Sequence, residues 1–268
     1  MLYCYIAVLL EKQFNNLTMK QFKALITDVD GTLIENGREA IPSKAMIEAV
    51  RRASELIHVG VATSRPLYML NNIFGPLNLS GPSIINGGAQ VIDAKTKKIL
   101  WRRNIAEEDF FKAVEIIQKF NLPFFIQEGQ PEDVYYSPGY QPDEKVLQIA
   151  LVGLEEKTAR SLRRKLKVIS GLGIHLVPDW VKNRVGIIIT HAEATKQYGI
   201  FQVAKILGID TKEIIGVGDG YNDFPLLLAC GLKVAMGDAP EDLKAIADIV
   251  VPPATKDGLV EVINQYIL

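Results

Sequence analysis

One short segment near the start of this 268-residue chain constrains its fold most strongly. Residues 23–33 read Lys-Ala-Leu-Ile-Thr-Asp-Val-Asp-Gly-Thr-Leu. The apolar part has the length of a buried strand, and it runs into two acids, Asp28 and Asp30. Because residues i and i+2 of an extended chain point to the same side, both carboxylates aim at one volume past the strand end. Open α/β sheets bind their ligands at such strand ends.

Two carboxylates this close repel each other unless a cation or a shared proton lies between them. The segment therefore predicts a Mg²⁺ and phosphate site. A plain polar turn after a strand would explain the same residues, since Asp-Gly is a frequent turn pair. The rest of the chain decides between the two interpretations.

The composition excludes several classes of partner. Lysine plus arginine total 30 and aspartate plus glutamate total 31, which gives a formal net charge of −1. No excess of positive charge indicates nucleic acid or an anionic membrane as a partner. The two cysteines, Cys4 and Cys230, are far apart in sequence and predict neither a disulfide framework nor a thiolate metal site. This usage favours a reducing, cytoplasmic location.

The N-terminal segment is a separate matter. Residues 2–10 are apolar but much shorter than the ~20 residues that a membrane-spanning helix needs. They also lack the basic region and the small-residue cleavage site of a secretory signal. Met19 comes directly before the first strand, so residues 1–18 are expected to be an extension or an upstream-start artefact rather than a membrane tether.

Strand and helix patterns alternate through the first 86 residues and again after residue 190. In the first stretch, strands are expected at 24–26, 57–62 and 83–85, with helices beginning near Ser43 and Pro66. This order implies right-handed parallel crossovers and a doubly wound, mainly parallel Rossmann-like sheet, that is, an α/β fold. The second stretch predicts helices at 193–207 and near 222, 241 and 259, and strands at 214–217 and 233–235.

The middle of the chain has a different pattern. A hairpin is expected at 89–103, helices at 107–120 and 155–166, and strands at 124–127, 146–154, 174–177 and 184–190. We interpret this region as an α+β cap inserted into the α/β core. The predicted division is a core of residues 19–86 and 191–268 and an inserted cap of residues 87–190.

A second acidic motif lies at 216–223, Gly-Val-Gly-Asp-Gly-Tyr-Asn-Asp. Asp219 follows a strand pattern between glycines, and Asp223 falls in the first turn of the next helix. Both are expected to face the cavity of Asp28 and Asp30. Four carboxylates without cysteine or histidine favour a hard cation, most plausibly Mg²⁺. The helix dipole alone would explain Asp223, but it would not explain Asp219.

Thr63 ends the second predicted strand and Lys196 lies in the first turn of a core helix. Either could be an ordinary exposed residue. Both, however, are predicted at the same edge of the sheet as the four acids, which favours a role at the site.

Taken in order, these motifs resemble those of the haloacid dehalogenase-like hydrolases. They comprise Asp-Val-Asp-Gly-Thr, Ala-Thr-Ser-Arg, a lysine before the last strand–helix units, and Gly-Asp-Gly-Tyr-Asn-Asp. The position of the insertion, Asn86-Gly87-Gly88 at its start and Val-Ala-Met-Gly at 234–237 are similar to the Cof-type sugar phosphatases, which carry a type IIB cap. The resemblance covers residues 20–268. Each motif is weak alone, whereas four in the right order form a strong signal.

The resemblance implies a mechanism in which Asp28 attacks the phosphorus of a phosphomonoester. Asp30 would act as the general acid and then as the general base. Mg²⁺ would be held by Asp28, the backbone carbonyl of Asp30, Asp219 and Asp223, the last directly or through water.

The resemblance also implies roles around the phosphate. Thr63 would donate its hydroxyl to a phosphoryl oxygen, Lys196 would supply positive charge, and Asn222 would add a further contact. The same motifs give three more expected substrate-binding residues: Ser64, Arg65 and Asn86. The chain departs from the family at Ser64, where glycine is usual, and neither this change nor Gln197 after the lysine removes a catalytic group.

The resemblance therefore implies a cytoplasmic Mg²⁺-dependent phosphatase of small phosphorylated metabolites, monomeric or homodimeric. A sugar phosphomutase of the same superfamily and a catalytically silent binding module on the same fold are the alternatives. The cap is expected to select the leaving group, with Trp180 in the cap interior or along the cleft. The polar candidates for this selection are Glu128, Tyr135, Tyr136, Lys182 and Arg184.

Overall fold

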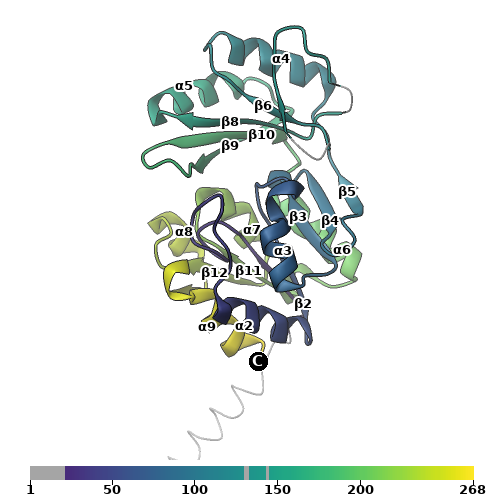
Figure 1. Ribbon diagram of the computed structural model, residues 1–268, viewed down its shortest axis with the longest axis vertical. Coiled ribbons are helices and arrows are strands. Elements are labelled where there is room, and N and C mark those ends of the chain that lie inside the picture. The colour runs from purple at the N-terminus through teal and green to yellow at the C-terminus, as the bar shows by residue number, and fades with distance from the viewer. Residues whose placement is uncertain (1–21, 130–132, 143–144) are drawn as a thin grey trace, which may run out of the picture.

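The computed structural model describes residues 22–129, 133–142 and 145–268. The expected extension at 1–18 lies outside these described residues. Figure 1 shows two stacked parts, a lower core that contains the C-terminus and an upper cap. The chain enters the cap after β5 (Ile99–Arg102) and returns to the core after β10 (Val185–His191).

The core contains a five-stranded parallel sheet in the order β13-β12-β11-β1-β2. Its strands are β1 (Ala24–Thr27), β2 (His58–Val61), β11 (Ile214–Gly218), β12 (Leu232–Met236) and β13 (Ile249–Val251). The predicted parallel α/β sheet is confirmed. Strand β13, three residues long, was not predicted.

Helices cover both faces of this sheet. One face carries α2 (Lys44–Ser54), α3 (Asn71–Leu77) and α9 (Gly258–Tyr266), and the other carries α6 (Lys196–Leu207), α7 (Phe224–Ala229) and α8 (Glu241–Ile246). In the part of the chain that the structure describes, no helix has the length and apolarity needed to cross a bilayer.

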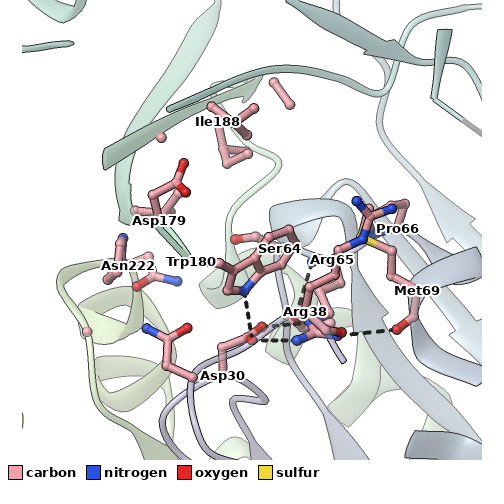
Figure 2. A pocket seen from close by; sticks show the side chains of 18 of the residues that line it. Asp30, Arg38, Ser64, Arg65, Pro66, Met69, Asp179, Trp180, Ile188 and Asn222 are labelled. Carbon is pink, nitrogen blue, oxygen red and sulfur yellow. Dashed lines mark hydrogen bonds and ion pairs between the residues drawn. The ribbon is translucent and has the colours of Figure 1, made fainter. Parts of the chain in front are cut away.

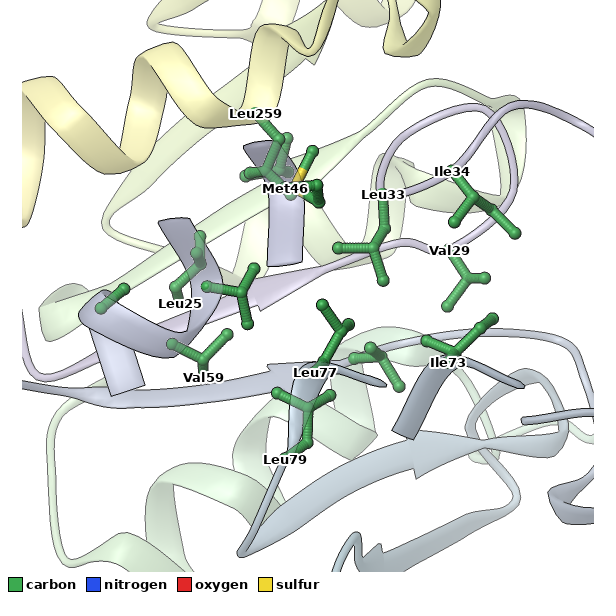
Figure 3. Close-up of a cluster of buried hydrophobic side chains, with 14 of the residues drawn as sticks. Leu25, Val29, Leu33, Ile34, Met46, Val59, Ile73, Leu77, Leu79 and Leu259 are labelled. Atoms are coloured by element: carbon green, nitrogen blue, oxygen red, sulfur yellow. The ribbon is translucent and has the colours of Figure 1, made fainter. Parts of the chain in front are cut away.

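Strand β1 is apolar because both of its faces are buried. Side chains alternate across a sheet, and Leu25 packs in the same cluster as Met46 and Leu259 (Figure 3). Ala24 and Ile26 pack in the opposite cluster, beside α6 and α7. A strand buried on both faces therefore reads as a continuous apolar run.

The third predicted strand differs from the expectation. Strand β3 (Pro82–Ile85) meets the parallel sheet through an isolated bridge between Ala62 and Ile84. Its ladder is antiparallel with β4 (Gln90–Asp93), which pairs in turn with β5. This hairpin was expected within the insertion, yet Val91 packs in the core cluster of α6. The division at residues 87 and 190 stays a prediction.

The cap is an antiparallel sheet in the order β7-β6-β8-β10-β9. Its strands are β6 (Phe125–Gln127), β7 (Val134–Tyr135), β8 (Gln148–Leu154), β9 (Leu172–Pro178) and β10. Helices α4 (Glu107–Gln118) and α5 (Glu156–Leu166) cover the face away from the core in Figure 1. The other face of the cap sheet is directed toward the strand ends of the core.

Five 3₁₀ turns complete the elements among the described residues. They are η1 (Leu67–Leu70), η2 (Asn86–Gly88), η3 (Thr211–Glu213), η4 (Tyr221–Asp223) and η5 (Ala254–Lys256). Turns η1 and η4 follow core strands and lie at the edge that faces the cap.

Candidate active site

The acids of the two motifs meet at the carboxyl ends of neighbouring strands. Thr27 of β1 and Val217 of β11 are paired in register, so the residues that follow each strand emerge side by side. Carboxylate oxygens of Asp28, Asp219 and Asp223 lie within 4.8 Å of one another. The structure thus brings together three of the four predicted acids as one cluster, which we call the acidic trio.

Asp223 is fixed by backbone hydrogen bonds. Its Oδ2 atom accepts from the backbone N–H of Asp219 at 3.1 Å and of Gly220 at 2.9 Å. These bonds fold the loop after β11 back on itself. As a result, a side chain from turn η4 reaches the end of the neighbouring strand β1.

Lys196 bridges two members of the acidic trio. It is the first residue of α6, and its Nζ atom lies 2.6 Å from Oδ1 of Asp28 and 2.6 Å from Oδ1 of Asp223. Burial opposes the charged form, but the carboxylates of Asp223 and Asp28 outweigh it and raise the pKa of Lys196. Lys196 is therefore a buried ammonium in contact with two members of the acidic trio, Asp28 and Asp223.

Negative charge at the trio is not fully compensated by this lysine. Burial, together with the charge of Asp223, raises the pKa of Asp28 despite Lys196. Burial and the charge of Asp28 likewise raise the pKa of Asp219. A buried group of oxygen donors with surplus negative charge fits a hard divalent cation.

The loop after β1 approaches the trio closely. Gly31 has a φ of +79°, and a Cβ atom there would lie 2.3 Å from Oδ2 of Asp219. Thr32 donates its hydroxyl to the other oxygen of Asp219 at 3.1 Å. Glycine is therefore needed at this position both for the backbone conformation and for the space beside a candidate metal ligand.

Asp30 has partners separate from the trio. Arg65 makes a bidentate ion pair with it, with Nε 2.8 Å from Oδ2 and an Nη2 atom 2.5 Å from Oδ1. Trp180 of the cap also donates its indole N–H to Oδ1 at 3.3 Å, as Figure 2 shows. The guanidinium carbon of Arg65 lies 5.4 Å from the centroid of the Trp180 ring. Asp30 is thus held by one residue of the core and one of the cap.

A cavity of about 590 Å³ lies between the strand ends of the core and the cap sheet. Predicted site residues that line it are Asp28, Asp30, Thr63, Ser64, Arg65, Asp219 and Asn222. Lys196 and Asp223 lie behind this wall, in contact with Asp28 and Asp219. Asn86 is buried, is not among the lining residues, and donates its side-chain N–H to Gln90 at 2.8 Å. The individual roles of these residues remain predictions.

The cap wall differs from the expected set. None of the five polar candidates, Glu128, Tyr135, Tyr136, Lys182 and Arg184, is among the described residues that line the cavity. Trp180 does line it. The wall residues that were missed include Gln148, Ala150 and Val152, every second residue of β8, which lie on one face of the strand.

Comparison with known proteins agrees with this geometry. The haloacid dehalogenase-like hydrolase family matches residues 25–170 and 130–263. The chain belongs to this family. The predicted resemblance to its Cof-type branch is also confirmed, and a solved structure described as a HAD subclass IIB sugar phosphatase is similar over 91% of this chain and 98% of its own, with 25% identity and a TM-score of 0.77.

Two further relatives extend the comparison. A phosphoglycolate phosphatase from Methanopyrus kandleri is 27% identical over 248 residues, which cover 91% of this chain and 96% of that protein. A haloacid dehalogenase-like hydrolase from B. subtilis matches with a TM-score of 0.79 at 20% identity over 91% of this chain and 99% of its own. The family and the phosphatases among the relatives confirm the predicted enzyme class, a phosphatase.

Proposed function

We propose that this protein hydrolyses small phosphomonoesters with Mg²⁺ through an aspartyl-phosphate on Asp28. The observation that carries the proposal is the position of Asp28 at the end of β1. It lies on the cavity wall, in contact with a buried ammonium and beside a second, separately held carboxylate, Asp30. A nucleophile and an acid/base group therefore share one cavity in distinct environments.

The acidic trio would hold the metal, with the backbone carbonyl of Asp30 as a further ligand. When bound, Mg²⁺ would neutralise charge on the phosphoryl oxygens and let an anionic carboxylate approach an anionic phosphate. Lys196 adds positive charge beside Asp28 and fixes the direction of its carboxylate. The donor set and the raised pKa values of Asp28 and Asp219 support this assignment.

In the first step, an oxygen of Asp28 forms a bond to phosphorus, and the bond between phosphorus and the ester oxygen breaks. Asp30 in its protonated form gives its proton to the departing alkoxide. In the second step, water attacks the phosphoryl group while Asp30 accepts a proton from it. Inorganic phosphate leaves and the carboxylate of Asp28 is restored.

Other groups on the wall would bind the phosphate. Thr63 lies at the end of the strand next to β1, and its Oγ1 accepts from the backbone N–H of Arg65 at 3.1 Å, so the hydroxyl proton is available to a phosphoryl oxygen. Asn222 reaches the same cavity from turn η4. The relatives named phosphoglycolate phosphatase and sugar phosphatase support a small phosphorylated metabolite as the substrate class.

Phosphate release from p-nitrophenyl phosphate tests the proposal, with Mg²⁺ present and with the metal removed by EDTA. The Asp28→Asn variant keeps the size and shape of the side chain and removes the nucleophile. We expect turnover by the unchanged protein with Mg²⁺ and none above background by the variant. Equal rates for the two proteins would contradict the assignment of Asp28.

Mannose 1-phosphate separates the phosphatase from the phosphomutase alternative. Hydrolysis gives free phosphate and mannose, whereas a mutase gives an isomeric sugar phosphate of unchanged mass. Isomer formation without free phosphate would overturn the proposal. Lack of turnover with every substrate would favour the catalytically silent module.

A further inference from the structure

The cap sheet presents an apolar face to the cavity. Residues that alternate along β8 divide into two sets: Ile149 and Leu151 pack in the interior of the cap, whereas Ala150 and Val152 line the cavity. Ile188 of β10 pairs with Ala150 and lies on the same side. In Figure 2, Ile188 lies across the cavity from Asp30. Val152 remains 49% exposed although it is apolar.

Small side chains line the middle of this cap wall. Ala150 and Gly186 lie between larger neighbours, and a Cβ atom on Gly186 would approach the Val177 side chain to 3.1 Å. Together with the indole of Trp180, these residues give the cavity an extended apolar surface with a shallow recess between the larger side chains. A flat group fits against such a surface better than a puckered one.

The polar groups of the cap wall are mostly occupied already. The carboxylate of Asp133 accepts from the Tyr68 hydroxyl at 2.9 Å and from Gln127 at 2.7 Å. The carboxylate of Asp179 accepts from the backbone N–H groups of Gly153 at 2.7 Å and Val181 at 2.8 Å. Apart from Gln148 and the indole N–H of Trp180, these two carboxylates are the polar side chains of the described cap wall, so a polyhydroxylated leaving group would find few partners there.

Gln148 differs from these residues. Its Oε1 atom is buried and has no hydrogen-bond partner among the described residues, although the side chain lies on the cavity wall. This oxygen is screened from the cavity, so Gln148 offers a leaving group no exposed carbonyl acceptor on this wall.

Charge on the wall disfavours a second anionic group on the substrate. The described lining residues include five aspartates and two arginines. Two of the aspartates, Asp28 and Asp219, belong to the proposed metal site, so the acids of the cap wall are Asp133 and Asp179. Arg65 is already paired with Asp30. Arg38 is the other, and its side chain is 61% exposed. A carboxylate on the leaving group would face more negative than positive charge.

From this wall, we infer that the leaving group is a flat, predominantly apolar aromatic or heteroaromatic ring. This inference rests on the proposed phosphatase function and names the substrate class of the same site. The inferred substrate class differs from phosphoglycolate and from sugar phosphates.

Four phosphomonoesters, each with its phosphate on a primary carbon, test the inference: benzyl phosphate, cyclohexylmethyl phosphate, glucose 6-phosphate and 2-phosphoglycolate. Their leaving groups are similar enough in basicity for fit to the cap to dominate kcat/KM. We expect benzyl phosphate to exceed glucose 6-phosphate and 2-phosphoglycolate at least ~10-fold, the scale of discrimination that an apolar pocket supplies. Cyclohexylmethyl phosphate should fall between them.

A pair of cap variants adds a control. Val152→Thr places a hydroxyl on the wall at nearly constant volume, and Val168→Thr makes the same change at a position that is 78% exposed and outside the cavity. We expect Val152→Thr to lower the preference for benzyl phosphate over glucose 6-phosphate several-fold. Val168→Thr should leave it unchanged.

The possible results separate the two proposals. Hydrolysis in which glucose 6-phosphate or 2-phosphoglycolate matches or exceeds benzyl phosphate would overturn the inference and leave the phosphatase function standing. Equal rates with benzyl and cyclohexylmethyl phosphate would refute the flat ring. Absence of phosphate release from all four esters and from p-nitrophenyl phosphate would overturn the proposed function and the inference together.

Discussion

The pairing of Arg65 with Asp30 gives the sharpest prediction. The sequence motif predicts that Arg65 binds substrate, whereas in the structure its guanidinium is directed at the carboxylate of Asp30. The Arg65→Lys variant distinguishes these roles because it keeps the positive charge and removes the planar fork. A lysine ammonium cannot contact both oxygens of Asp30 and the backbone at once.

The size of the effect follows from the contacts that are lost. Besides Asp30, the guanidinium donates to the carbonyl oxygens of Gly37 at 2.7 Å, Arg38 at 3.1 Å and Met69 at 3.4 Å. Hydrogen bonds to charged groups contribute about 1.5–3 kcal/mol each, and a lysine would retain part of this set. We expect the free energy of unfolding to fall by about 1–3 kcal/mol.

The effect on catalysis is separate. A carboxylate that is free to rotate spends less time in line with the ester oxygen, and misplacement by about 1 Å costs up to ~100-fold in rate. We therefore expect kcat to fall roughly 10- to 100-fold while KM changes less than about threefold, because the proposed phosphate contacts of Thr63 and Asn222 remain.

Steady-state kinetics with p-nitrophenyl phosphate and a thermal unfolding curve measure both quantities on the same preparation. Trp180→Phe serves as a milder companion, since it removes the N–H donor to Asp30 and keeps a ring beside Arg65. It should lower kcat about two- to tenfold, in keeping with one hydrogen bond from a half-exposed side chain. A folded Arg65→Lys variant with unchanged kcat and raised KM would refute the positioning role and support direct substrate binding.

Three other perturbations have defined outcomes. Lys196→Met should abolish turnover and lower the free energy of unfolding by about 3–5 kcal/mol, measured by denaturant titration, because Asp28 and Asp223 lose their buried counter-charge; normal stability would contradict this. Removing metal with EDTA should stop turnover, and Mg²⁺ should restore it and raise the melting temperature, whereas Asp219→Asn should lose most of the melting shift. Burial lowers the pKa of His175 from 6.5 to about 4, so the unfolded chain binds an extra proton between these values. The contribution of His175 to stability is thus lost as pH falls below about 6.5, by at most about 1.4 kcal/mol per unit; His175→Gln should remove this part of the pH dependence in melts from pH 4 to 7, and an unchanged pH dependence would contradict the assignment.

The acids at strand ends were predictable from sequence because local geometry fixes them. An apolar strand followed by Asp-x-Asp must present both side chains just beyond the sheet, and β1 does so with Asp28. The β-α alternation then places β11 beside β1, and Asp219 follows from that neighbour relation. Lys196 was predictable in the same way, as the first residue of a helix at this sheet edge.

The partners of Asp30 were not predictable. Arg65 is 35 residues away and Trp180 is 150 residues away in sequence. The contact of Trp180 depends on how the cap docks on the core, and that of Arg65 on how the loop after β2 folds against the loop after β1; no local pattern encodes either. The sequence therefore predicts Asp30 as a site residue but not its contacts with Arg65 and Trp180.

Strand β8 shows why the cap wall escaped prediction as well. It reads Gln-Ile-Ala-Leu-Val-Gly-Leu, so both faces of the strand carry apolar residues and the alternation does not reveal which face is interior. Helices α4 and α5 cover one face. An antiparallel sheet with a single helical layer ordinarily turns polar side chains to water on its other face, yet here Ala150, Val152 and Ile188 occupy it. The proposed apolar leaving group would account for apolar residues on that face, across the cavity from Asp30.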